Sequence, residues 1–124
     1  MLLQLDLSST VPIYTQIRNQ ILLGIADGRL TTGEKLPTIR ALADETGINM
    51  MTVNKAYQLL KQEGFIAADR RSGAVVVTGG MIPSDIVEKT TAALNLLVSE
   101  AKLKGMKKEE FLALAGSLFD KLEV

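Results

Sequence analysis

The first regular pattern in the chain is a run of isoleucines at every fourth position, Ile13, Ile17, Ile21 and Ile25. Apolar side chains at this spacing lie along one face of an α-helix, so the pattern predicts an amphipathic helix with one buried side. Pro12 suits the first turn of a helix, where its missing N–H has no intrahelical role, and Gly28 suits the end. We therefore expect the first helix between these two residues.

Two further helical patterns follow, separated by a single glycine. A polar loop over residues 30–35 closes at Leu36-Pro37, and a helix can begin only after this proline. Thr38 and Asn49 are good N-caps, whereas Gly47 and Gly64 suit the left-handed position after a helix. One face of the later helix carries Val53, Ala56, Tyr57 and Leu60. The pattern predicts a short helix, a turn and a third helix.

A hairpin and two more helices complete the predicted elements. Two short apolar runs, residues 65–69 and 74–78, flank a polar stretch, as the strands of a β-hairpin do. After Gly79-Gly80, helical spacing predicts one helix that ends at Gly105 and another from about Lys107. The expected fold is mainly α: an N-terminal winged helix-turn-helix of three helices plus a β-hairpin wing, residues 1–78, and a short C-terminal helical hairpin, residues 79–124.

The composition excludes most catalytic chemistry. The chain has no cysteine and no histidine, which removes zinc fingers, thiol nucleophiles and histidine-based triads. The acidic pairs Asp44-Glu45 and Glu109-Glu110 are adjacent on helices, so their members point in different directions and are more simply solvated surface. We expect no enzymatic activity, no cofactor and no metal.

Hydropathy and charge limit the classes of partner that the protein can have. No stretch approaches the ~18 uninterrupted apolar residues of a membrane span, and the first residues lack the basic and apolar regions of a signal peptide. We therefore expect a cytoplasmic protein with no membrane partner. The net charge is zero, with 14 basic and 14 acidic residues, so the total charge does not indicate nucleic-acid binding.

The order of the predicted elements, unlike the total charge, does indicate DNA binding. A short helix, a glycine turn and a third helix with a polar outer face form a helix-turn-helix, although the pair could equally be an ordinary packed corner. Arg70 and Arg71 at the tip of the hairpin are natural if that tip lies along a phosphate backbone or minor groove. One alternative stays open, favoured by the neutral charge: a winged-helix protein-interaction module without DNA binding.

The same segments resemble a known family over nearly the whole chain. The motifs are Pro12-Ile13-Tyr14 with Gln16-Ile17, the run from Gly33 to Ala43, Gly47-Ile48-Asn49 with Thr52-Val53, Ala56-Tyr57 with Leu60, and Glu63-Gly64-Phe65-Ile66. In this order and spacing the chain resembles the GntR regulators, and in length it resembles their short YtrA-like branch. The resemblance implies a sequence-specific DNA-binding transcriptional regulator, a repressor that binds an inverted-repeat operator in double-stranded DNA as a homodimer.

The predicted DNA-binding residues lie in the two helices of the helix-turn-helix and in the wing. The resemblance places Arg40 against DNA, and the alternative is a surface ion pair with Asp44 one turn away. Thr52 and Asn54 meet base edges from the first turns of the third helix, whereas one residue of Met50-Met51 is expected to pack in the core. The full set is Thr38, Arg40, Asn49, Met51, Thr52, Asn54, Lys55, Arg70, Arg71 and Gly73.

The C-terminal helices carry more apolar surface than two helices can bury against each other, so they need a partner. Because Gly79-Gly80 and Pro83 indicate a hinge, we expect the equivalent helices of a second chain to cover them in a four-helix dimer interface. The predicted interface residues are Leu94, Leu97, Val98, Ala101, Phe111, Leu114, Leu118, Phe119 and Leu122. This appendage is expected to be too small for a ligand pocket of the usual ~300 Å³, and the sequence specifies no effector.

Overall fold

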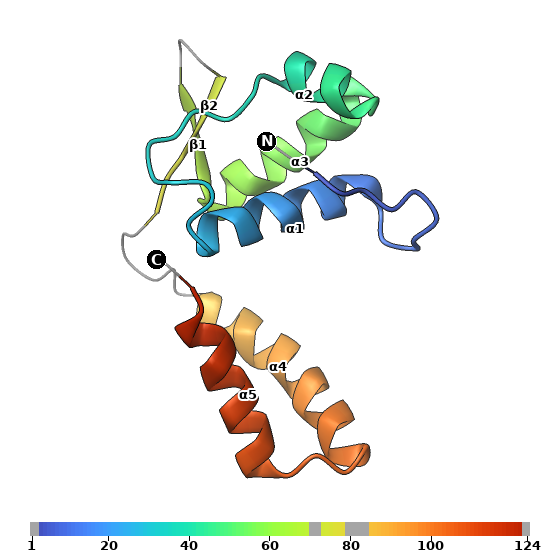
Figure 1. The fold of residues 1–124 in the computed structure, drawn as a ribbon, viewed down its shortest axis with the longest axis vertical. Helices are drawn as coiled ribbons and strands as arrows, with labels where there is room; N and C mark the ends of the chain where they lie inside the picture. The colour runs from blue at the N-terminus through green and yellow to red at the C-terminus, as the bar shows by residue number, and fades with distance from the viewer. Residues whose placement is uncertain (1–2, 70–72, 79–84, 123–124) are drawn as a thin grey trace. The chain divides into compact units, whose positions relative to one another are not determined.

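The computed structural model describes residues 3–69, 73–78 and 85–122 (Figure 1). Within them the elements are α1 (Ile13–Ala26), α2 (Ile39–Thr46), α3 (Met50–Glu63), β1 (Ile66–Asp69), β2 (Gly73–Val76), α4 (Ile86–Leu103) and α5 (Lys108–Asp120). This is the mainly α architecture that the sequence predicts. The chain divides between residues 78 and 79 into two compact units.

The helix ends of the first unit follow from local chemistry. The Thr38 hydroxyl accepts a hydrogen bond from the Ala41 N–H at 3.0 Å, and the Asn49 side-chain oxygen accepts one from the Met51 N–H at 2.7 Å. Both bonds satisfy amides that the helix itself leaves unpaired. Gly47 and Gly64 end α2 and α3 with φ of 73° and 85°, which glycine adopts without steric cost. The predicted caps are confirmed.

The first unit is built around α3, whose apolar face is buried between α1, α2 and the hairpin. The core side chains are Ile17, Ile21, Ile25, Leu36, Leu42, Ala43, Val53, Ala56, Tyr57, Leu60, Ile66, Ala74 and Val76. The Tyr57 hydroxyl donates a hydrogen bond to the Pro37 carbonyl at 2.7 Å, which ties α3 to the start of α2. The orientation of α3 is therefore fixed from several sides.

An ion pair on the surface of this core joins α1 to the end of α3. The Arg18 guanidinium donates to both carboxylate oxygens of Glu63, at 2.9 and 2.8 Å, and it also lies 5.8 Å from the centroid of the Phe65 ring. Both charged side chains are less than one-fifth exposed. A bidentate ion pair of this kind restrains both the separation and the relative orientation of the two side chains, so it helps to fix how α1 and α3 cross.

The wing contains more than the predicted hairpin. β1 and β2 pair antiparallel, with Ile66 opposite Val76 and Asp69 opposite Gly73. The segment before Pro37 then pairs with the other edge of β2, because the N–H groups of Gly33 and Leu36 donate to the carbonyls of Val76 and Ala74 at 2.8 and 3.0 Å. The expectation of a plain loop over residues 30–35 is thus wrong for its second half.

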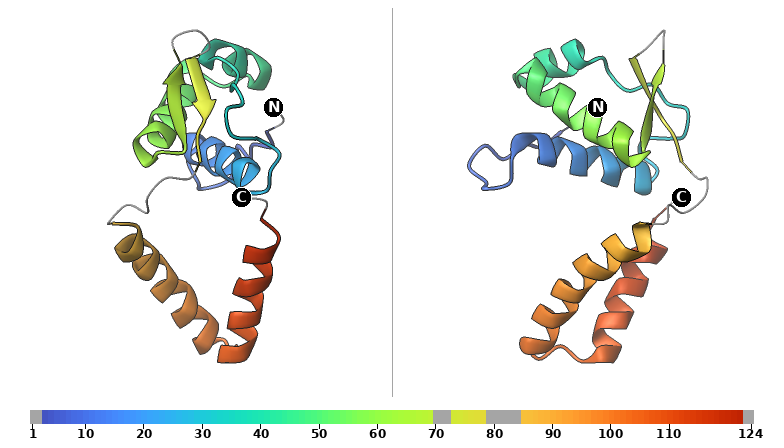
Figure 2. Two further views of the ribbon diagram at one scale, coloured as in Figure 1. Left: turned by 90° about the vertical axis from the view of Figure 1, so that its left-hand side faces the viewer. Right: turned by 180° about the vertical axis from the view of Figure 1, so that it is seen from behind.

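The second unit is a helical hairpin whose turn contains Gly105, at a φ of 94°. From this turn α4 and α5 diverge (Figure 2), and neither helix contains a buried residue. The face of α5 predicted to be buried is therefore open within one chain, with Leu114 and Phe119 51% and 80% exposed. A hollow of about 570 Å³ lies between the two helices.

Among the helices in the described part of the chain, none is both long enough and apolar enough to cross a lipid bilayer.

Candidate nucleic-acid interface

The elements that would face DNA lie on one side of the first unit. In each view, α2, the first turns of α3 and the ends of β1 and β2 that flank residues 70–72 are found at the same end of the unit (Figures 1 and 2). A third helix and a hairpin arranged in this way can approach one duplex together.

The start of α3 presents its outer face to solvent. Met51, Asn54 and Lys55 are exposed, while Val53 between them is fully buried. Met50 and Met51 are 45% and 80% exposed, so the expectation that one of them packs in the core is wrong. Met51 is about 200° from Val53 around the helix, and Met50 belongs to the first turn, where the packing against the core ends. Both thioethers are thus available at the surface.

Asn54 projects from this outer face and is held by its neighbour one turn later. The Gln58 side-chain amide donates to the Asn54 side-chain oxygen at 3.4 Å, which leaves the Asn54 NH₂ group free to donate. Gln58 is absent from the predicted set of site residues. Its position four residues after Asn54 on the same helix face is the signal that could have identified it.

Arg40 lies exposed in the first turn of α2. Among the described residues the ion pairs are Arg18–Glu63 and Arg29–Asp27, so the alternative reading of Arg40 as a partner of Asp44 does not apply. An exposed guanidinium without a carboxylate partner can bond a phosphate without first breaking a contact.

Lys55 is oriented by an aromatic ring. Its ammonium group lies 4.0 Å from the centroid of the half-buried Tyr14 ring at the start of α1. This cation–π contact restrains the lysine along the side of α3 that faces α1. The side chain remains exposed, so the ammonium can still interact with a phosphate.

The remaining predicted residues differ in what their side chains already do. The acceptor atoms of Thr38 and Asn49 serve as helix caps, and the Asn49 NH₂ group remains for donation. Thr52 is half-buried behind the exposed residues of its turn. Gly73 begins β2 at a φ of 88° with open space around its Cα. Arg70 and Arg71 lie outside the described residues.

A buried phenol lies behind the exposed face of α3. Burial, with a smaller contribution from the Glu45 carboxylate, raises the pKa of Tyr57 above its ordinary value. The phenol therefore stays neutral and keeps its hydrogen bond to Pro37. Within the part of the chain that the structure describes, no cluster of three or more acidic side chains could hold a metal ion.

A helix-turn-helix with a polar outer face, followed by a hairpin on the same side, defines a winged helix-turn-helix regulator of transcription. Residues 13–76 match the model of the gntR family of bacterial regulatory proteins, and the chain belongs to this family. It is thus a DNA-binding transcriptional regulator. Membership of this family confirms the prediction that the protein is not an enzyme.

Two curated relatives come from Bacillus subtilis. The HTH-type transcriptional regulator YhcF is 31% identical over 105 residues, which cover 84% of this chain and 87% of YhcF. The HTH-type transcriptional repressor YtrA is 39% identical over 75 residues, 60% of this chain and 58% of YtrA. The resemblance to the YtrA-like branch is confirmed.

Known structures of transcriptional regulators have a similar fold. YtrA from Sulfolobus acidocaldarius, a GntR-family transcription factor, matches with a TM-score of 0.66 and 40% identity, over 82% of this chain and 97% of that one. A transcriptional antiterminator from Listeria monocytogenes matches with a TM-score of 0.84 and 28% identity, over 95% and 90%. The DNA-binding domain of AraR in complex with operator ORX1 matches with a TM-score of 0.52 and 28% identity, over 61% and 93%.

Proposed function

We propose that this protein is a transcriptional repressor that binds an inverted-repeat operator as a homodimer. In this proposal residues 1–78 are the DNA-binding domain and residues 79–124 join the two copies. The observation that carries it is the exposed first part of α3, which lies on the same side of the unit as α2 and the hairpin. The relative YtrA, described as a repressor, supports the direction of regulation. Since such a protein works on chromosomal DNA, its location would be cytoplasmic.

The proposed contacts divide by the kind of information they carry. In the major groove, Thr52 and Asn54 would meet base edges, and Met51 would contact thymine methyl groups, because a thioether cannot donate a hydrogen bond to a base. Arg40 and Lys55 would bind phosphates and add affinity without reading sequence. The AraR domain, which forms a complex with its operator, supports this placement of the fold.

The remaining polar groups of the predicted set would support the same docking. Thr38 and Asn49 lie at the starts of α2 and α3, where free N–H groups point outward and favour a phosphate oxygen. Gly73, at the start of β2, lets the backbone of the wing come close to the duplex, and Arg70 and Arg71 would follow the phosphate backbone or minor groove there.

The homodimer rests on the open apolar faces of α4 and α5. Leu94, Leu97, Leu114 and Leu118 are 42–57% exposed in a single chain. Apolar stripes of this extent on both helices indicate a protein partner, and a second copy offers the same surface in a closed, twofold arrangement. Two linked DNA-binding domains would then bind the second half-site at high effective concentration.

A second function remains a candidate because the net charge is zero. A winged helix can keep its fold and bind a protein instead of DNA. The two functions differ in their response to salt, because each phosphate contact releases a counterion, whereas protein partners rarely show so steep a dependence.

Footprinting on the promoter region of the protein's own gene, at several salt concentrations, tests the proposal. We expect two protected half-sites about one helical turn apart, ~34 Å, and affinity that falls steeply as salt increases. The matched control is the same fragment with one half-site scrambled, which should lose protection there and bind more weakly. Binding that is equal on both fragments and insensitive to salt would contradict the proposal and favour the protein-interaction module.

A further inference from the structure

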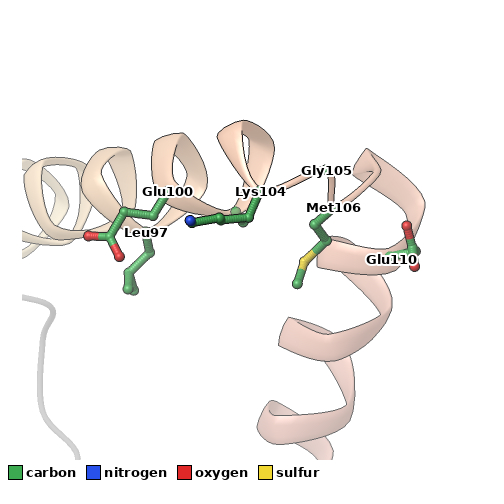
Figure 3. Close-up of a pocket in the computed structure, with 7 residues that line it drawn as sticks. Leu97, Glu100, Lys104, Gly105, Met106 and Glu110 are labelled. Carbon is green, nitrogen blue, oxygen red and sulfur yellow. The ribbon is translucent and has the colours of Figure 1, made fainter.

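The hollow between α4 and α5 is almost entirely apolar. It has a volume of about 570 Å³, and its apolar lining comes from Leu94, Val98, Ala101, Met106, Phe111 and Leu112. A second hollow at the same turn is different in character. There, Leu97 and Met106 point to the same side, and the polar side chains of Glu100 and Lys104 lie beside Leu97 (Figure 3). The first hollow therefore suits a large apolar side chain, and the second does not.

The far end of α5 carries such a side chain. Phe119 is 80% exposed, and it lies within about 20° of Leu112 around the helix, two turns further along. Because α5 is one straight element, Phe119 cannot fold back into the hollow of its own chain. An exposed aromatic ring at one end of the helix and an apolar hollow at the other end are complementary only between two chains.

A glycine lies between them on the same stripe. Gly116 is about 40° from Leu112 around α5, and a glycine inside a helix costs roughly 1 kcal/mol relative to alanine. Apart from the adjoining backbone of α5 and the two chain neighbours, no atom of the described residues lies within 4 Å of the position that a Cβ would take, so no packing contact within one protomer requires glycine here. A close approach by the backbone or side chain of a partner helix would require it.

One carboxylate beside the ring has possible partners at the hollow. Lys102, Lys107 and Lys108 lie at the edge of the apolar hollow. Asp120 directly follows Phe119, and Lys121 comes next. If the ring entered the hollow, the carboxylate would come close to this basic edge, whereas two hairpins packed turn against turn would bring the lysines of both copies together.

We propose that the two helical hairpins of the homodimer pack antiparallel, with Phe119 of each protomer in the α4–α5 hollow of its partner. This arrangement rests on the proposed homodimer and specifies its interface. It obeys twofold symmetry, because the same contact is made twice. The two α4 helices then begin at opposite ends of the bundle.

Cysteine cross-linking tests the orientation directly, because the chain has no cysteine of its own. The variants are Lys108→Cys, Asp120→Cys and the double variant, each treated with a short bismaleimide after sedimentation velocity has established the oligomeric state. Within one chain these positions are about 18 Å apart along α5, beyond the reach of the reagent. We expect the double variant to form covalent dimers and each single variant to stay largely unlinked.

The possible outcomes separate the orientation from the dimer itself. Efficient linkage of either single variant would show that the same end of α5 from both copies meets in the dimer, and the antiparallel arrangement would be wrong. A dimer in which no variant links would also overturn it. A monomeric wild-type protein would refute the proposed homodimer, and with it the arrangement, and would leave the hollow to a foreign partner.

A second pair of variants tests the role of the ring. Phe119→Ala should raise the dimer dissociation constant by about tenfold or more, as expected for a buried aromatic anchor. Leu103→Ala is the matched control: Leu103 is 86% exposed and lies about 180° from Leu94 around α4. It should change the constant by less than about twofold. Equal effects of the two substitutions would show that Phe119 is not seated in the partner's hollow.

Discussion

At the scale of single residues, the surroundings of Arg40 favour a role in binding phosphate. Its guanidinium is exposed and unpaired within the described residues. As a phosphate ligand it would add affinity on any sequence. We therefore expect Arg40→Ala to weaken binding to operator and non-operator DNA alike and to lower the slope of log affinity against log salt by roughly one unit. Arg29→Ala, which removes an arginine paired with Asp27 at the end of α1, should leave both unchanged. Unchanged affinity in a folded Arg40→Ala protein would refute the assignment.

Asn54 should behave in the opposite way, because an amide that bonds adenine carries sequence information. Asn54→Ala is expected to lose ~1–3 kcal/mol of discrimination at one base position in each half-site and to leave non-specific binding nearly intact. Binding to a set of single-base operator variants measures this. Gln58→Ala should give a weaker version of the same loss, because Gln58 only orients Asn54. Equal losses on operator and random DNA would move Asn54 to the phosphate contacts.

At the scale of elements, Tyr57 links α3 to the segment that begins α2. Tyr57→Phe removes the bond to the Pro37 carbonyl and should lower the free energy of unfolding by ~1 kcal/mol. Because burial raises the pKa of Tyr57 above the ordinary value of 10.0, the unfolded chain loses this proton first, and stability should fall as the pH rises above about 10.

Urea unfolding at about pH 8 and pH 11 checks both effects. The wild-type protein should lose more stability between these two conditions than Tyr57→Phe, which has no proton to lose at this position. If both proteins lost the same amount, the alkaline sensitivity would have to come from another group.

The elements that sequence predicts well are those with local causes. The caps Thr38 and Asn49 and the glycines that end α2 and α3 act within a few residues, so the helix boundaries follow from the sequence itself. The pairing of Gly33 and Leu36 with β2 depends on residues about forty positions away and has no apolar alternation to signal it. The exposure of Met50 is likewise set by where neighbouring helices end, and periodicity alone does not contain that information.

The candidate site follows the same division. That α3 has a polar outer face is visible in the spacing of Val53, Ala56, Tyr57 and Leu60, because those residues determine which face is left exposed. The contacts that orient the outer side chains come from other elements, as in the approach of Lys55 to Tyr14. The exposed face of α3 was therefore predictable, whereas the exposure of both Met50 and Met51 and the geometry of the individual side chains were not.

For the whole molecule, charge gives little attraction to DNA. The 14 basic and 14 acidic residues cancel, so long-range steering of the protein toward DNA is weak. In the proposed homodimer, affinity would therefore come from a few local contacts that each copy makes once, and dimerisation would supply a large share of the binding free energy. A regulator built in this way depends on its second unit, although that unit touches no DNA in the proposed complex.

Removing the second unit tests that dependence. Every residue that is buried in the described chain lies between Ile17 and Val76, so a fragment that ends at Thr78 keeps its whole core and should fold as a soluble monomer. It should bind a single half-site as the full chain does but lose the gain from a second half-site, a factor of ~10² or more. Sedimentation velocity gives the oligomeric state, and titrations against DNA with one and with two half-sites give the gain. A fragment that stays dimeric and keeps full operator affinity would show that the two C-terminal helices are not the dimer interface.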